Sequence, residues 1–153
     1  MSNHLHFDSV LCDINASSLK QTYQILADHI SQLIGTPKQS IFLHLMTAEK
    51  EENSFIGNGI AIPHMRLERL TKPMIVLAKL NNPIESAEQD MQPVDLVCLV
   101  LSPDYEGPKH LQRLAIVSRY FKDEQFVEHL RQCKTADDIR NVLQVTNNQR
   151  LAA

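Results

Sequence analysis

An uninterrupted apolar run at residues 96–101 is the feature of this 153-residue chain that most constrains its fold. The run is rich in Val and Leu and has the length of a strand, well short of the roughly 20 apolar residues that a membrane-spanning helix needs. Because both faces of such a strand are apolar, we expect it inside a sheet. Apolar runs at residues 60–62 and 74–80 predict two further buried strands. The pattern predicts no membrane insertion.

Helical periodicity precedes these strands. Apolar residues three and four apart predict a helix from Leu19 to Leu33, with Ser17 or Ser18 as its cap and Gly35 as its end. A second series of apolar residues with helical spacing follows directly, so we expect a pair of helices.

The second helix is expected to begin with Thr36 as its cap and Pro37 in its first turn, and to end near Glu51. After Pro103 the helical period returns three times, at residues 111–121, at 126–130 behind Asp123, and at 139–143 behind a capping box. Helices therefore stand before and after the strands.

This order predicts an α/β fold, a three-layer α/β/α sandwich around a mixed β-sheet. A single domain over residues 1–153 is expected, since domains typically have about 100–200 residues. Residues 1–7 and 147–153 are expected to be loose termini.

Charge and cysteine content exclude several classes of function. The net charge is −3 without a Lys/Arg block, which does not support binding to nucleic acid or to an anionic membrane. Cys12, Cys98 and Cys133 are odd in number and far apart, which argues against a disulfide framework and a zinc cluster. The N-terminus lacks the basic and apolar regions of a signal peptide. We expect a cytoplasmic protein without a metal or cofactor.

Two of the four glycines flank Asn58 in the segment IGNGIAIPHMR, residues 56–66. Gly57, Asn58 and Gly59 can take positive φ, so their turn can direct backbone N–H groups into an anion-binding concavity ahead of His64. The alternative is a tight turn into a buried strand, with His64 a hydrogen-bonded core or loop histidine. The segment alone supports both interpretations.

His110 lies in the first turn of the helix that Pro108 is expected to begin. Unsatisfied N–H groups and the positive end of the helix dipole favour an anion there. Two histidines suit phosphoryl transfer, because one neutral imidazole can attack phosphorus while the other stabilises developing charge. The alternative is that His110 donates to a nearby carbonyl group.

Both segments resemble the enzyme IIA domains of the fructose/mannitol class of the bacterial phosphoenolpyruvate-dependent phosphotransferase system (PTS), especially the nitrogen-regulatory members. IGNGIAIPH ends in the residue that aligns with the phosphorylated histidine of the family, here His64. HLQRLAIVSRYF begins with the residue that aligns with the second active-site histidine, here His110, and QPVDLVCLVL supports the match. The resemblance covers nearly the whole chain and implies an α/β/α fold.

The resemblance implies that a histidine phosphocarrier protein donates phosphate to His64. Sugar-transporting members pass the phosphate to a IIB domain, whereas regulatory members bind other proteins according to their phosphorylation state. No IIB or membrane domain is present in this sequence, which favours a regulator that carries phosphohistidine rather than a conventional enzyme. A separate sugar-specific IIA component is the alternative.

One position departs from the family pattern. The family usually has arginine nine residues before the first glycine of the G-N-G turn, where this chain has Ala48. A guanidinium can bind phosphate through two donors, which Lys50 would replace only as a point charge. Arg66, two residues after His64, is the other candidate for this charge. The substitution leaves two alternatives: phosphoryl acceptance is slower, or the domain is a degenerate binder that takes no phosphate.

Overall fold

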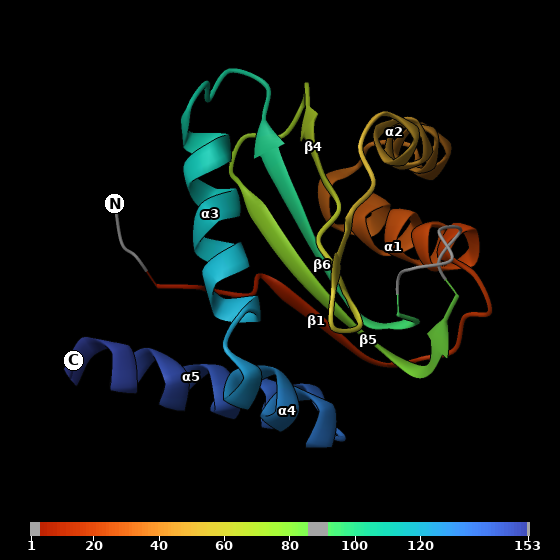
Figure 1. Ribbon diagram of the computed structural model, residues 1–153. Coiled ribbons are helices and arrows are strands. Elements are labelled where there is room, and N and C mark those ends of the chain that lie inside the picture. The colour runs from red at the N-terminus through yellow and green to blue at the C-terminus, as the bar shows by residue number, and fades with distance from the viewer. Residues whose placement is uncertain (1–3, 86–91, 153) are drawn as a thin grey trace.

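The computed structural model describes residues 4–85 and 92–152, which form six strands and five helices (Figure 1). The elements are, in order, β1 (Ser9–Ile14), α1 (Leu19–Ile34), α2 (Lys38–Glu51), β2 (Phe55–Gly57), β3 (Ile60–Ala61), β4 (His64–Leu67), β5 (Met74–Ile84), β6 (Val94–Pro103), α3 (Lys109–Phe121), α4 (Glu124–Gln132) and α5 (Ala136–Ala152). Within these residues, no helix combines the length and the apolar character needed to cross a membrane.

Strand β6 lies inside one mixed six-stranded sheet, as its apolar sequence predicts. The strand order is β1-β5-β6-β3-β2, and β4 also pairs with β6. β5 runs antiparallel to β6, whereas β3 and β4 run parallel to it and pair with successive parts of the strand. Ile60 lies beside Leu96, and His64 lies beside Val100. This register determines how far His64 lies from the turn that precedes β3.

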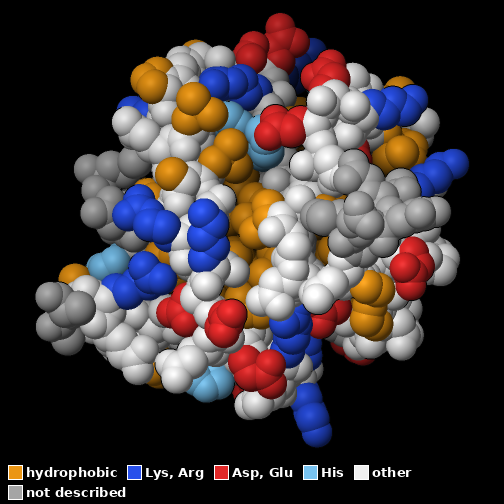
Figure 2. Space-filling view, in the orientation of Figure 1, with side chains coloured by type: hydrophobic (Ala, Val, Ile, Leu, Met, Phe, Trp, Pro, Cys, Tyr) orange, Lys and Arg blue, Asp and Glu red, His pale blue; other side chains and the backbone are white. Residues whose placement is uncertain are grey.

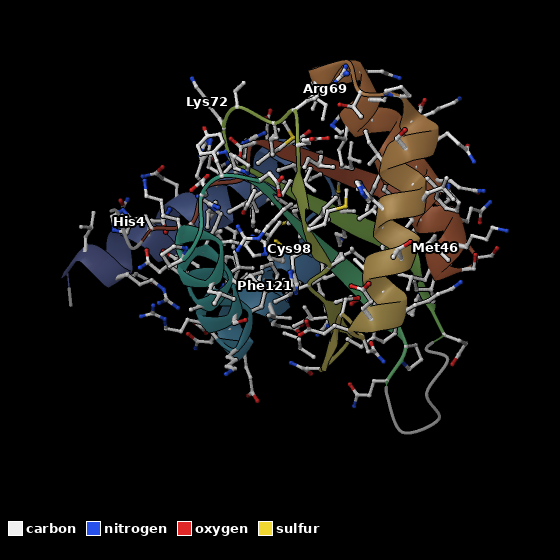
Figure 3. All side chains as sticks on the ribbon, turned by 90° about the horizontal axis from the view of Figure 1, so that it is seen from above. His4, Met46, Arg69, Lys72, Cys98 and Phe121 are labelled. Atoms are coloured by element: carbon white, nitrogen blue, oxygen red, sulfur yellow. The ribbon has the colours of Figure 1, made fainter. Side chains whose placement is uncertain are left out.

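Side chains of β5 and β6 alternate between two hydrophobic cores, one on each face of the sheet. Cys98 belongs to the core beneath α3, α4 and α5, and Val97 belongs to the core beneath α1 and α2. Figure 1 shows the same division of the helices. In the view from above, Cys98 and Phe121 lie on one side and Met46 of α2 lies on the other (Figure 3). The predicted three-layer α/β/α sandwich is confirmed.

Most helix ends agree with the capping residues in the sequence. The Ser18 side chain accepts a backbone N–H at the start of α1, and Gly35 ends that helix with a φ of +81°. Asp123 caps α4 in the same way. The start of α2 differs, because Pro37 rather than Thr36 occupies the N-cap position and no side chain caps this helix. Proline fixes its own φ near the helical value, which starts the helix without a side-chain acceptor.

Strands β1, β2 and β4 are not predicted by apolar runs. In β4, half-buried His64 and Arg66 alternate with buried Met65 and Leu67. These short segments form strands here because β5, β3 and β6 supply hydrogen-bonding partners for β1, β2 and β4 respectively. Strand β5 also continues to Ile84, beyond the end of its apolar run.

The expectation of loose termini is wrong for the described residues 4–7 and 147–152. Leu5 and Phe7 are 2% and 0% exposed in the core beneath α3, α4 and α5. The carbonyl oxygen of Leu5 accepts from Asn147 Nδ2 at 3.1 Å, and that of Phe7 accepts from Arg140 Nη1 at 2.9 Å. The two ends of the chain therefore hold each other, and α5 continues to Ala152. Residues 1–3 and 153 lie outside the described residues.

Candidate functional site

The fold brings His64 and His110 side by side, although they are 46 positions apart in the sequence. His64 is the first residue of β4 and lies beside Val100 of β6, and His110 lies in the first turn of α3. Nδ1 of His64 is 3.1 Å from Nε2 of His110, and the ring centroids are 5.2 Å apart. The two histidines that the sequence analysis singled out therefore form one site.

His110 is held in a buried position behind His64, with 4% of its surface exposed. Its Nδ1 lies 2.6 Å from Oγ of Ser102, which follows the apolar run of β6. Burial is the main reason that the pKa of His110 falls to about 4; the neighbouring His64, Arg66 and Arg113 lower it further, and Glu106 opposes them. His110 is therefore a neutral imidazole near pH 7.

Arg113 lies one helical turn after His110 and contacts the same hydroxyl group. Its Nη1 donates to Ser102 Oγ at 2.7 Å, and its Nη2 pairs with the Glu106 carboxylate at 3.0 Å. The Arg113 and Glu106 side chains are only 13% and 9% exposed, so solvent screens this ion pair weakly. Ser102 and Arg113 are site residues that no sequence motif indicates. The i, i+3 spacing of His110 and Arg113 is the signal that could have indicated the arginine.

A pocket of about 410 Å³ lies in front of His64, between β4, α3 and the end of α2. Figure 2 shows histidine surface in pale blue beside an acidic side chain in red, in the upper part of the face it presents. The lining residues are Tyr23, Leu45, Ala48, Glu49, Glu51, Glu52, Ser54, Pro63, His64, Met65, Arg66 and His110. The pocket has room for a phosphoryl group attached to His64.

The α2 side of the pocket is acidic. Oε2 of Glu52 lies 3.7 Å from Nε2 of His64, and the Glu52 side chain is 75% exposed. The Glu49 carboxylate accepts from the Tyr23 hydroxyl at 3.3 Å and from the Ser54 backbone N–H at 3.0 Å. Burial and the nearby Glu49 raise the pKa of Tyr23, so its hydroxyl remains a donor. On this side of the pocket, the Glu49 carboxylate is held by hydrogen bonds and the Glu52 carboxylate is exposed.

Arg66 supplies positive charge on the other side. It is the one lysine or arginine among the described residues that line the pocket. Arg66 lies two residues after His64 in β4, so the two side chains share one face of the strand. Its Nη2 donates to the carbonyl oxygen of Gly107 at 3.0 Å. Ala48 lines the same pocket without a charge.

This arrangement suits nucleophilic chemistry at an imidazole. Nδ1 of His64 faces the buried His110, which leaves Nε2 directed to the side of Glu52. A neutral imidazole nitrogen beside a cation can attack an electrophilic phosphorus atom. Across residues 4–85 and 92–152, no group of three or more His, Cys, Asp and Glu side chains is arranged to hold a metal ion.

Comparisons with known proteins show the family to which the chain belongs. The family model described as "Phosphoenolpyruvate-dependent sugar phosphotransferase system, EIIA 2" matches residues 3–145. The chain belongs to this EIIA family. Its α/β/α fold is therefore the fold of an EIIA domain.

Proteins similar to this EIIA chain include nitrogen regulatory proteins. The one from Bradyrhizobium diazoefficiens is 36% identical over 136 residues, which cover 89% of each chain. The one from Escherichia coli K12 is 29% identical over 144 residues, which cover 94% of this chain and 88% of the relative. The crystal structure of nitrogen regulatory protein IIA-Ntr from Neisseria meningitidis has a TM-score of 0.80 at 24% identity, over 88% of this chain and 92% of that one. The structural likeness shows the fold.

The G-N-G turn of this EIIA chain lies away from the histidine pocket. Gly57, Asn58 and Gly59 all have positive φ, as their sequence predicts. None of the three lines the pocket, and the pairing of β3 and β4 with β6 separates Ile60 from His64 by four residues, about 13 Å of strand. The expected phosphate cradle at this turn is therefore not formed around His64.

Arg131 of α4 holds this turn instead. Its guanidinium donates to the carbonyl oxygen of Asn58 and pairs with Asp95 at 3.0 Å. A Cβ atom on Gly59 would lie 2.4 Å from Arg131 Nη2. Glycine at this position thus allows the close approach of the arginine, and the turn has a structural role that fixes the β2–β3 hairpin.

Proposed function

We propose that this EIIA chain is a regulatory phosphocarrier. A histidine phosphocarrier protein phosphorylates it on His64, and its phosphorylation state controls its binding to partner proteins. The observation that carries the proposal is the pair formed by His64 and neutral His110, 3.1 Å apart at a pocket that also contains Arg66. The relatives called nitrogen regulatory proteins support the regulatory role. We expect the protein to act in the cytoplasm without a cofactor.

Nε2 of His64 is the nitrogen expected to attack phosphorus. Nδ1 is occupied by the contact with His110, whereas Nε2 lies on the side of the exposed Glu52. As the Nε2–P bond forms, the P–N bond of the donor phosphohistidine breaks and its electron pair returns to the donor imidazole. The Nε2 lone pair is free when the ring proton of neutral His64 is on Nδ1, where it faces Nε2 of His110 at 3.1 Å. After the transfer the ring of phosphorylated His64 loses this Nδ1 proton and the donor imidazole takes up a proton, which balances the transfer.

His110 and Arg66 have different supporting roles. His110 contacts the far nitrogen of the His64 ring, so we expect it to orient the ring and to stabilise the charge that develops during transfer. Arg66 lines the pocket itself and is the expected partner of the phosphoryl oxygens. Backbone groups of the G-N-G turn do not line the pocket and are assigned no role there.

A second candidate function is a IIA-like domain that binds partners without taking phosphate. Ala48 favours this candidate, because it leaves the α2 side of the pocket without a cation while Glu51 and Glu52 add negative charge there. These carboxylates would repel a phosphoryl group on His64. Whether the protein accepts phosphate from the phosphocarrier protein distinguishes the two functions.

Mass spectrometry of the protein incubated with phosphoenolpyruvate, enzyme I and the phosphocarrier protein tests the proposal. We expect an acid-labile adduct of one phosphoryl group. His64→Ala should abolish it, and His110→Ala should slow it by roughly a hundred- to a thousandfold, as loss of one stabilising donor does elsewhere. His44→Ala is the matched control, since His44 is exposed on α2 and does not line the pocket.

Three results would contradict the proposal. Labelled His64→Ala protein would show that the site is wrong. An unlabelled parent protein, alongside a sugar-specific IIA domain that is labelled by the same donor, would favour the non-phosphorylated binder. Transfer of the label to an added IIB domain would instead identify a sugar-specific component.

A further inference from the structure

The carboxylate of Glu52 lies beside the nitrogen of His64 that is expected to attack phosphorus. Oε2 of Glu52 is 3.7 Å from Nε2 of His64. A nucleophile and the atom that it attacks are about 3–3.5 Å apart before they react. The carboxylate therefore occupies the space through which a phosphoryl group must approach Nε2. Before transfer, either the carboxylate moves away or another group compensates its charge.

The backbone around Glu52 is held on both sides, whereas its side chain is exposed. Glu52 is the C-cap residue of α2, and its N–H donates to the carbonyl oxygen of Ala48 at 2.9 Å. Two residues later, the backbone N–H of Ser54 donates to the Glu49 carboxylate at 3.0 Å. The Glu52 side chain itself is 75% exposed. The carboxylate can therefore turn towards a partner protein without a change in the backbone.

Other groups at the end of α2 add to this negative charge. The helix ends at Glu51, and the carbonyl end of a helix carries a partial negative charge. Glu51 and Glu52 both line the pocket, whereas Lys50, the basic residue of the last turn, is not among its lining residues. On the opposite side, Nη2 of Arg66 donates to a backbone carbonyl oxygen. A phosphoryl anion that enters alone thus meets the charge of Glu52 without a compensating cation from α2.

A small phosphoryl donor and a protein donor would meet this charge differently. A small donor brings negative charge and nothing to compensate Glu52, so charge repulsion opposes its approach to His64. A protein donor can bring a lysine or arginine side chain beside its phosphohistidine, and the exposed carboxylate of Glu52 can pair with that cation. This pairing removes the repulsion when the phosphoryl group arrives. The same carboxylate would therefore oppose the first donor and assist the second.

We infer that Glu52 is a specificity-determining residue of this site. Its carboxylate excludes small phosphoryl anions from His64 and admits a phosphoryl group from a protein donor that carries a cation beside its phosphohistidine. The role of the protein donor rests on the proposed function, whereas the exclusion of small anions rests on the contact between Glu52 and His64. This role makes an acidic side chain compatible with a pocket that accepts phosphate.

Phosphoramidate, a small phosphoryl donor, tests the exclusion without any phosphocarrier protein. As the Nε2–P bond forms, the P–N bond of the reagent breaks, and ammonia leaves with its electron pair and takes up the proton that Nδ1 of His64 releases. We expect Glu52→Gln to raise the rate of labelling at His64 by roughly three- to tenfold, measured by peptide mass spectrometry. Two unit charges about 4 Å apart in bulk water change a rate about fivefold, and Glu52 is largely exposed to water.

Three variants and a second reagent separate the charge of Glu52 from other effects. Glu128→Gln, at an exposed position of α4 outside the pocket, makes the same change in net charge and should match the parent protein. Glu51→Gln should raise the rate less, because the carboxylate beside His64 is that of Glu52. Glu52→Asp keeps the charge and should remain closer to the parent than Glu52→Gln does. Diethyl pyrocarbonate, a neutral electrophile, should label His64 equally fast in the parent and in Glu52→Gln at about pH 8, where imidazole is ordinarily neutral.

The phosphocarrier protein tests the second half of the inference, and the expected change has the opposite direction. Glu52→Gln should raise the donor concentration that gives the half-maximal rate by roughly two- to fivefold, the effect of losing one exposed ion pair. Added salt should raise this concentration for the parent more than for the variant, because salt screens the ion pair. Structural damage at position 52 would slow labelling by both donors. Faster labelling by the small donor together with weaker use of the protein donor is the signature of Glu52 as a specificity-determining residue.

The outcomes separate this inference from the proposed function. An unchanged rate with phosphoramidate in Glu52→Gln, or no labelling of this variant, would overturn the exclusion of small anions. An equal rise with diethyl pyrocarbonate would overturn the role of charge. A half-maximal donor concentration that does not rise in Glu52→Gln would overturn the pairing with a cation of the protein donor. Faster labelling of Glu52→Gln by phosphoramidate, in a protein that the phosphocarrier protein never phosphorylates, would overturn the proposed function and leave the exclusion supported.

Discussion

Replacing Ala48 with arginine is the most direct test of the electrostatics of the pocket. Ala48 lines the same pocket as His64 and contributes no charge, whereas Glu51 and Glu52 contribute negative charge. A guanidinium there could donate charge-assisted hydrogen bonds to phosphoryl oxygens. We therefore expect Ala48→Arg to speed phosphoryl acceptance and to prolong the phosphohistidine.

The size of the effect follows from the surroundings. Hydrogen bonds to charged groups typically contribute about 1.5–3 kcal/mol, and about 1.4 kcal/mol corresponds to tenfold in rate. Glu52 is 75% exposed and would compete with the phosphoryl group for the new guanidinium, as would water. We therefore expect a contribution at the lower end of this energy range, which corresponds to roughly a tenfold change in the rate of phosphorylation and in the half-life of the phosphohistidine.

Both quantities can be measured by mass spectrometry with the same donor. Ala48→Met is the control, since it lengthens the side chain without a charge. Arg66→Ala tests the alternative that the existing arginine already serves the phosphoryl group; in that case Ala48→Arg changes little and Arg66→Ala slows transfer sharply. If neither arginine variant changes the rate or the half-life, no arginine serves this site and the reasoning is refuted.

Three further predictions concern stability. Gly59→Ala should destabilise the protein by about 1 kcal/mol more than Gly57→Ala in urea unfolding. Both residues have positive φ, but only a Cβ on Gly59 would displace the end of the Arg131 side chain, 2.4 Å away, from Asn58 and Asp95; equal losses would contradict this role of Arg131. Asp123→Ala should lower the free energy of unfolding by about 1 kcal/mol in thermal denaturation, because its side chain caps α4; an unchanged midpoint would mean that water replaces the cap. The pKa of His110 is lowered from 6.5 to about 4 in the folded protein, so the unfolded chain binds the proton more readily and the free energy of unfolding should fall as the pH decreases from 6.5 to about 4. His110→Asn should reduce this dependence of the free energy on pH, measured by urea unfolding at several pH values. An equal dependence in the variant would contradict the lowered pKa.

Local chemistry in the sequence determines several elements of the fold. Ser18 and Asp123 accept N–H groups from the helices that they begin, and Gly35 takes the left-handed conformation that ends α1. These contacts span a few residues, so the pattern alone predicts them. The apolar run of β6 predicts a strand covered on both faces for a similarly direct reason, because every side chain in it avoids water.

The two histidines are recognised from their motifs, but their surroundings are not. Ser102 ends the apolar run of β6, and nothing in its neighbours indicates that it contacts His110. Arg113 could equally be an exposed helix residue, and only the packing of α3 against β6 buries it beside Ser102. The contacts of Ser102 with His110 and Arg113 therefore form only in the tertiary structure.

The sequence by itself determined the order of helices and buried strands, the positive φ of the G-N-G turn and the two histidines of the site. Only the tertiary structure decided where that turn lies, because the pairing of β3 and β4 with β6 places Ile60 and His64 four residues apart along one strand. It also decided that Leu5 and Phe7 are buried, through contacts with α5 at the other end of the chain. Helix caps and turn conformations depend on neighbouring residues, whereas register and packing depend on partners far away in the sequence, which a local pattern does not encode.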